Sequence, residues 1–244
     1  MKITKLFWLV ILCFCCLACN YKILTAQKVK WVIFDFDGTL ADTLPLTMEF
    51  INKSCAELGC NPIKPEAFRE NKISKIITDH LGWWNIISAP LFVSQLAPKC
   101  MDFFKANRDR ITIFSGAKEL LEVLSTKYRL AIITPCEKEI VTQTLEKYGI
   151  SRLFEGVYSD GFSLIWGIDV TIKKFLVDHK LNPDEVLYVG DQDTDIFACK
   201  KVGVKMISAT WGYNSRAFLE QATPDYLADS FDELALTIAS FGNA

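Results

Sequence analysis

The hydrophobic pattern changes character near Gly116. Beyond it, short apolar runs alternate with segments whose apolar residues recur at helical spacing, which is typical of a parallel sheet with crossover helices. The predicted strands are residues 130–134, 156–159, 186–190 and 204–208, and the predicted helices are residues 117–124, 138–148, 172–179, 196–201 and 232–241. The pattern therefore predicts an α/β protein with a Rossmann-like, doubly wound parallel sheet.

Residues 44–114 differ from this pattern, because they show helical spacing and no strand signal. Apolar residues from Leu46 to Cys55 recur at this spacing, and Gly59 ends the first helix. Further helices are expected over residues 65–81 and 91–107. We therefore predict an N-terminal segment of residues 1–26, a core of residues 27–43 and 115–244, and an inserted helical domain of residues 44–114.

The N-terminal segment is the compositional outlier. Lys2 and Lys5 precede an uncharged apolar run, residues 6–21, which is the pattern of an export signal. The run is shorter than the ~20 apolar residues that a transmembrane helix needs. A false upstream start or a loose hydrophobic tail is the alternative interpretation.

Cysteine usage bears on the compartment. Four of the nine Cys lie in the apolar run, and the remaining odd number contains no CxxC pair, which indicates reduced thiols. We therefore expect a cytoplasmic catalytic body. Membrane anchoring or export through residues 1–20 is the alternative, and membrane association is expected through this segment only. The net charge of −2 gives no basis for a nucleic-acid partner.

The first predicted strand, residues 31–34, runs directly into two carboxylates. Asp35 and Asp37 project to the same side of an extended backbone, and Gly38 allows the chain to turn. Because neighbouring carboxylates repel each other, this pair indicates a cation bound between them.

Two other predicted strands also end in polar residues. Thr134 and Asp191 each follow an apolar run, as Asp35 does. Ligands of parallel sheets bind beyond the carboxyl ends of the strands. The three residues therefore predict one site assembled from distant parts of the chain.

The run Asp35-Phe-Asp37-Gly-Thr39 resembles the signature of the haloacid dehalogenase superfamily, whose commonest members are phosphatases. Thr134 stands at the second motif of that family, and Gly190-Asp191-Gln-Asp-Thr-Asp195 stands at the fourth. The resemblance covers residues 30 to about 234, and residues 44–114 match the position of the family's helical cap. The run of residues 208–216 resembles phosphoglycolate phosphatase-like members.

The resemblance implies a phosphatase that acts on a small phosphorylated metabolite with Mg²⁺ as cofactor. Asp35 would attack phosphorus to form an aspartyl-phosphate, and Asp37 would protonate the leaving group and then activate water. The metal-binding residues would be Asp35, Asp37 through its carbonyl, Asp191 and, in a supporting position, Asp195. The phosphate-binding groups would be the Thr134 hydroxyl and the backbone amides of Gly38 and Thr39.

Two departures from the family pattern stand out. Pro135 follows Thr134 and removes a backbone N–H that could have faced a phosphate. The third-motif Lys is expected near residues 166–168, where no Lys stands. Lys173 or Lys174 would replace it if either side chain reached the site; solvated positions are the simpler interpretation. Loss of such a cation typically costs ~10²-fold in rate, so we predict a slow or specialised phosphatase.

Three functions remain open from the sequence. The first is the Mg²⁺-dependent phosphatase, and the second is a phosphoglucomutase-like phosphotransferase with a cap that excludes water. The third is a catalytically weak protein that binds a phosphate ligand or a partner, which the missing Lys keeps open. Trp83, Trp84 and Phe92 would face the substrate or form the core of the cap.

Overall fold

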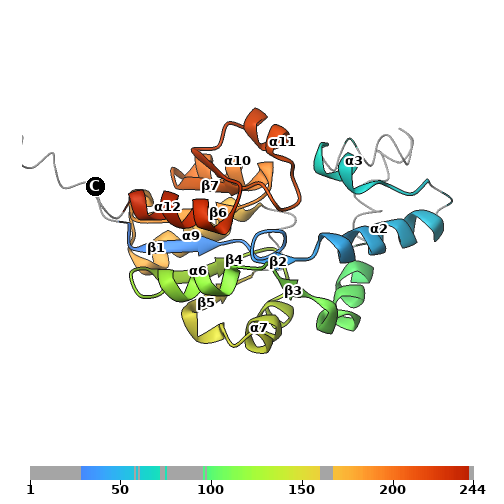
Figure 1. The fold of residues 1–244 in the computed structure, drawn as a ribbon, viewed down its shortest axis with the longest axis horizontal. Helices are drawn as coiled ribbons and strands as arrows, with labels where there is room; N and C mark the ends of the chain where they lie inside the picture. The colour runs from blue at the N-terminus through green and yellow to red at the C-terminus, as the bar shows by residue number, and fades with distance from the viewer. Residues whose placement is uncertain are drawn as a thin grey trace, which may run out of the picture.

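The computed structural model describes residues 29–57, 59, 61–71, 75, 96, 98–159 and 167–241. Its centre is a six-stranded sheet in the order β5-β4-β1-β6-β7-β8, in which all neighbouring strands run parallel (Figure 1). The strands are β1 (Trp31–Phe34), β4 (Arg129–Ile133), β5 (Phe154–Tyr158), β6 (Val186–Gly190), β7 (Lys205–Ala209) and β8 (Tyr226–Ala228). The predicted α/β fold class is confirmed.

The register of the central strands aligns the ends that carry the predicted site. Phe34, the last residue of β1, lies opposite Ile132 of β4 and Val189 of β6. The next residue along β1 is Asp35, and the chain leaves β4 at Thr134 and β6 at Asp191. The three polar residues therefore emerge at the same edge of the sheet.

Helices cover both faces of the sheet, because side chains alternate between the faces along each strand. On one face Val32 and Phe34 of β1 belong to a buried cluster with α6 (Ala117–Leu124), α7 (Lys138–Lys147) and α12 (Phe231–Ser240). On the other face Trp31 and Ile33 pack with α9 (Ile168–His179), α10 (Asp193–Val202) and α11 (Arg216–Gln221). Short 3₁₀ turns are η1 (Arg108–Arg110), η2 (Ser151–Leu153) and η3 (Pro183–Glu185).

The insertion leaves and re-enters the core through a small antiparallel pair of strands. β2 (Ala41–Asp42) pairs with β3 (Thr112–Ile113), with Ala41 opposite Ile113. Between them lie α2 (Leu44–Glu57), α3 (Pro65–Arg69) and a further helical stretch over residues 98–106, all to one side of the sheet (Figure 1). The prediction that residues 44–114 contain no strand is wrong, because β3 lies inside that range. A two-residue strand is too short to produce an alternating pattern.

Three other elements differ from the prediction. β8 and α11 were not predicted, and β8 is a three-residue edge strand that pairs with β7 and leaves Tyr226 exposed. α9 begins four residues before its predicted start, at Ile168.

Several predictions lie outside the described residues. They concern the N-terminal segment of residues 1–26, the side chains of Trp83, Trp84 and Phe92, and parts of the helices predicted over residues 65–81 and 91–107. The proposed domain boundaries stay a prediction. No helix in the described part of the chain is long and apolar enough to cross a membrane.

Candidate active site

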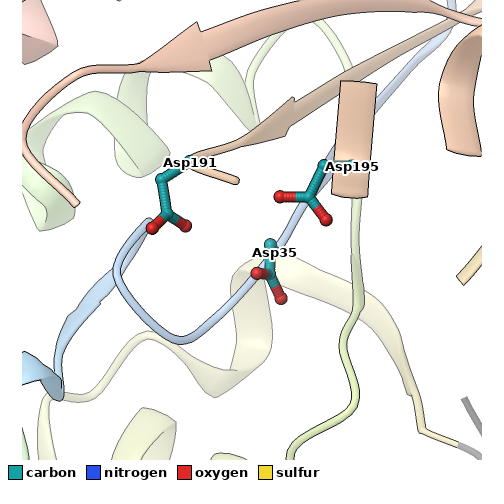
Figure 2. A group of neighbouring side chains, drawn as sticks. All are labelled: Asp35, Asp191 and Asp195. Carbon is teal, nitrogen blue, oxygen red and sulfur yellow. The ribbon is translucent and has the colours of Figure 1, made fainter. Parts of the chain in front are cut away.

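Three buried carboxylates converge at the carboxyl edge of the sheet. Asp35 follows β1 and donates its backbone N–H to the Val189 carbonyl at 2.8 Å, which fixes the end of β1 against β6. Asp191 follows β6, and Asp195 lies in the first turn of α10. One oxygen from each carboxylate lies within 4.8 Å of the others, and Figure 2 shows the three neighbouring side chains.

The electrostatics of this acid cluster oppose its ionisation. Burial raises the pKa of Asp35 well above its usual value, and the charges of Asp195 and Asp37 raise it further. Burial and the charge of Asp35 likewise raise the pKa of Asp191. Burial, followed by the charge of Asp191, raises the pKa of Asp195 to about 8. A divalent cation among these oxygens would remove the repulsion, and an all-oxygen donor set suits a hard cation such as Mg²⁺.

Asp37 lies two residues beyond Asp35 at the start of the turn. Its Oδ1 atom is buried without a hydrogen-bond partner. Burial raises the pKa of this carboxyl, and the Thr43 hydroxyl and the Cys136 thiol partly oppose that shift. A raised pKa favours the protonated form that a general acid needs near neutral pH.

Asp191 is held by hydrogen bonds to both of its oxygens. The Thr39 hydroxyl donates to Oδ1 at 2.7 Å, and the backbone N–H of Tyr213 donates to Oδ2 at 2.6 Å. Two glycines allow these approaches: a Cβ on Gly38 or on Gly212 would lie 2.3 Å from Asp191 Oδ2. Gly38 also has φ of +77°, which disfavours any other residue there. The position of this carboxylate is therefore specified from several sides.

The two turn residues predicted to bind phosphate have other partners. The Gly38 N–H donates to the Ala41 carbonyl at 2.8 Å, which closes the turn. The Thr39 hydroxyl is buried against Asp191, and the Trp211 indole N–H donates to the Thr39 carbonyl at 3.1 Å. Both residues thus hold the frame of the acid cluster, and a phosphate contact by Gly38 or Thr39 stays a prediction.

The end of β4 forms a second side of the site. Thr134 is buried, and its hydroxyl lowers the pKa of Asp35, which places the two groups together as predicted. The Cys136 N–H donates to the Thr134 hydroxyl oxygen at 3.2 Å. Burial and the charge of Asp37 raise the pKa of the Cys136 thiol, so the protonated thiol is a poor nucleophile. Packing, rather than covalent chemistry, accounts for Cys136.

The two candidate replacements for the third-motif lysine both occupy exposed positions of α9. The Lys174 ammonium lies 2.7 Å from the Asp178 carboxylate at the surface. Lys173 is also exposed. Residues 160–166, next to the position expected for the family's Lys, lie outside the described residues. In the described part of α9, the arrangement favours the solvated interpretation of both lysines.

The segment around Tyr213 contributes to the site without having been predicted to do so. Its contact with Asp191 uses a backbone N–H, which leaves no signature in the sequence. The Asn214 side chain adds to the same frame by accepting a hydrogen bond from the Asp193 N–H at 2.9 Å. The resemblance of residues 208–216 to one subgroup was the only signal that pointed to this segment.

Comparison with known proteins agrees with this geometry. Residues 32–209 match the family described as "Haloacid dehalogenase-like hydrolase". A phosphoglycolate phosphatase of Vibrio parahaemolyticus is 28% identical over 225 residues, which are 88% of this chain and 99% of the relative. A phosphoglycolate phosphatase of Synechococcus elongatus is 27% identical over 208 residues, which are 83% of this chain and 94% of the relative.

Solved structures show the same fold. A predicted phosphatase from Clostridium acetobutylicum superposes with a TM-score of 0.73 at 20% identity, covering 88% of this chain and 100% of the other. A haloacid dehalogenase-like hydrolase from Streptococcus pneumoniae superposes with a TM-score of 0.70 at 23% identity, covering 88% of this chain and 99% of the other. The chain therefore belongs to the haloacid dehalogenase-like hydrolase family and is related to its phosphoglycolate phosphatases.

Proposed function

We propose that the protein is a Mg²⁺-dependent phosphatase that hydrolyses a small phosphorylated metabolite through an aspartyl-phosphate intermediate. The observation that carries the proposal is the convergence of Asp35 with Asp191 and Asp195, with Asp37 two residues beyond the nucleophile. The relationship to phosphoglycolate phosphatases supports 2-phosphoglycolate as the first substrate to test.

The chain's own residues account for the two chemical steps. A carboxylate oxygen of Asp35 attacks phosphorus, the bond from phosphorus to the leaving oxygen breaks, and Asp37 gives that oxygen its proton. Asp37 then takes a proton from water, the water oxygen attacks phosphorus, and the Asp35 carboxylate is released with inorganic phosphate. The Thr134 hydroxyl, which bonds Asp35 in the structure, would donate to a phosphoryl oxygen of the bound substrate.

Asp35, the Asp37 carbonyl and Asp191 would hold the Mg²⁺, and Asp195 would orient them. The bound ion would supply positive charge that offsets the repulsion between an anionic nucleophile and a phosphate. The lack of any Lys or Arg between Arg152 and Lys173 supports a slow rate.

The test is hydrolysis of p-nitrophenyl phosphate and of a panel of phosphorylated metabolites that includes 2-phosphoglycolate. Wild type should be active with Mg²⁺ and inactive in EDTA. Asp35→Asn keeps the size of the side chain and should lose at least about 10³-fold in kcat. Asp184→Asn, in η3 at the start of β6, is the matched control and should retain wild-type activity.

Two outcomes would contradict the proposal. The first is wild-type turnover that is unaffected by EDTA or by Asp35→Asn. The second is binding of Mg²⁺ and phosphate without turnover of any phosphomonoester, which would favour a ligand-binding protein.

A further inference from the structure

Tyr213 belongs to the core by its backbone and to the insertion by its side chain. Its side chain lies in a small buried cluster with Met48, Cys55, Ile63 and Phe68, all of which come from the insertion. Its ring centroid lies 5.9 Å from that of Phe68 in α3. A residue that follows β7 therefore packs among apolar side chains of the insertion.

The Tyr213 hydroxyl is fixed at the start of the cap. It lies 3.0 Å from the Thr43 hydroxyl, immediately before α2, and 2.6 Å from the Thr47 hydroxyl in the first turn of α2. The same core segment meets α3 through two further hydrogen bonds: Arg69 donates to the Thr210 carbonyl at 2.9 Å, and the Ser215 N–H donates to the Arg69 carbonyl at 3.0 Å.

The backbone of Tyr213 is also bound to the acid cluster. Its N–H donates to Asp191 Oδ2 at 2.6 Å, and its ring lies close above the Gly38 turn, where an added Cβ would meet the ring at 2.3 Å. A change in the position of the cap that moves the Tyr213 side chain must therefore also act on the residue that orients Asp191. Packed and hydrogen-bonded contacts of this kind transmit displacement because the interior is dense.

We propose that Tyr213 is a positioning residue that couples docking of the helical cap to the orientation of Asp191, and hence to the affinity of the site for Mg²⁺. The inference rests on the proposed role of Asp191 as a metal ligand. Because such coupling is reciprocal, bound Mg²⁺ also favours the docked cap. The hydroxyl of Tyr213 enters no chemical step.

Two variants test the coupling from opposite sides of the contact. Tyr213→Phe removes the hydroxyl but keeps the ring and the backbone N–H. Thr47→Val removes the partner hydroxyl in α2 and alters no acidic residue. The matched controls are Tyr226→Phe on the edge strand β8 and Thr237→Val in α12, whose hydroxyl bonds the Glu233 carbonyl.

The measurement is the Kd for Mg²⁺ alone by isothermal titration calorimetry, together with Tm in EDTA. We expect both test variants to weaken Mg²⁺ binding about 3–10-fold, the range for loss of one or two hydrogen bonds, and both controls to match wild type. The double variant should weaken binding no more than the stronger single variant, because both changes remove the same contact.

A merely structural role would lower Tm in EDTA without changing the Kd. The proposal is overturned if Thr47→Val and Tyr213→Phe bind Mg²⁺ within twofold of wild type, or if wild type binds no Mg²⁺. If Tyr213→Phe does not fold, Thr47→Val alone decides. A wild type that binds Mg²⁺ but hydrolyses no phosphomonoester would contradict the proposed function and leave this inference standing.

Discussion

The two sides of the candidate site are built very differently. On the acid side, at the ends of β1 and β6, three carboxylates converge, and Asp191 is bonded through both of its oxygens. On the other side, at the ends of β4 and β5, Thr134 is followed by Pro135 and Cys136. No Lys stands at residues 166–168, where the family resemblance implies the third-motif lysine.

This difference separates two requirements of phosphoryl transfer. The acid side supplies the nucleophile and the oxygen ligands for a cation, and it matches the family signature. The β4–β5 side would meet the phosphoryl oxygens, and it departs from the signature. Because the two sides would serve different requirements, variants on the two sides should fail in different measurements.

Among the variants that compare the two sides, the largest effect is expected from Thr134→Val on the β4 side. The substitution keeps the shape of the side chain but removes the hydroxyl that would donate to a phosphoryl oxygen. We expect kcat/KM for p-nitrophenyl phosphate to fall about 10–100-fold, and the Mg²⁺ Kd to rise no more than about threefold through loss of the hydrogen bond to Asp35. Thr142→Val in α7, whose hydroxyl bonds the Lys138 carbonyl, is the control. Loss of Mg²⁺ binding in Thr134→Val would show that the β4 side also serves metal binding and would contradict the separation of roles.

A smaller effect is expected from Asp195→Asn on the acid side. It is measured as the change in Tm in EDTA, where no metal is bound. When the pKa of a buried acid is higher in the folded state than in the unfolded state, the protein loses stability as pH rises from the unfolded-state pKa to the folded-state pKa. For Asp195 this window runs from 3.8 to about 8. In EDTA at pH 8 we expect the variant to melt about 2–6 °C above wild type.

At pH 4 the difference in Tm between Asp195→Asn and wild type should nearly vanish, because wild-type Asp195 then carries a proton in the folded state. The amide oxygen can still accept the hydrogen bond that Asp195 Oδ2 receives from the Gln192 N–H at 3.0 Å. Calorimetric Tm values across this pH range, with and without Mg²⁺, provide the measurement. A variant that melts below wild type at pH 8 in EDTA would show that the acid cluster is not a source of repulsion.

The smallest effect is expected from Lys173→Ala and Lys174→Ala. Both side chains are exposed on α9, and the Lys174 ammonium pairs with Asp178 at the surface. Surface charges of this kind contribute little, so kcat/KM should change by less than about twofold. A loss of tenfold or more in Lys173→Ala alone would instead identify that side chain as the substitute cation and would make the two sides of the site more alike.

The sequence predicted the acid side well because its features are local. Asp35 and Asp191 each directly follow a buried apolar run, and parallel pairing brings the ends of such runs to one edge; Asp195 follows one helical turn after Asp191. The fold class followed from the same alternation of strands and helices. The short strands β3 and β8 were missed because two or three residues carry no periodic signal.

The frame around Asp191 could not be predicted from the sequence. Thr39 reaches it across 152 positions of the chain, and Tyr213 uses a backbone N–H that any residue except Pro would offer. The sequence identified Thr39 through its amide, whose contact with phosphate stays a prediction, and gave no sign that its hydroxyl bonds Asp191. Long-range hydrogen bonds of this kind depend on the packed fold and not on the order of residues.

The β2–β3 pair has a consequence for how such a protein can change over time. Ala41 lies opposite Ile113, and the Phe114 N–H donates to the Leu40 carbonyl at 3.0 Å. The two ends of the insertion therefore lie side by side where it joins the core, as the two strands of a hairpin do. The six-stranded sheet therefore takes no strand from the insertion. The insertion acts on the catalytic edge through the contacts of Tyr213 and Arg69, so an exchanged segment would have to preserve those contacts.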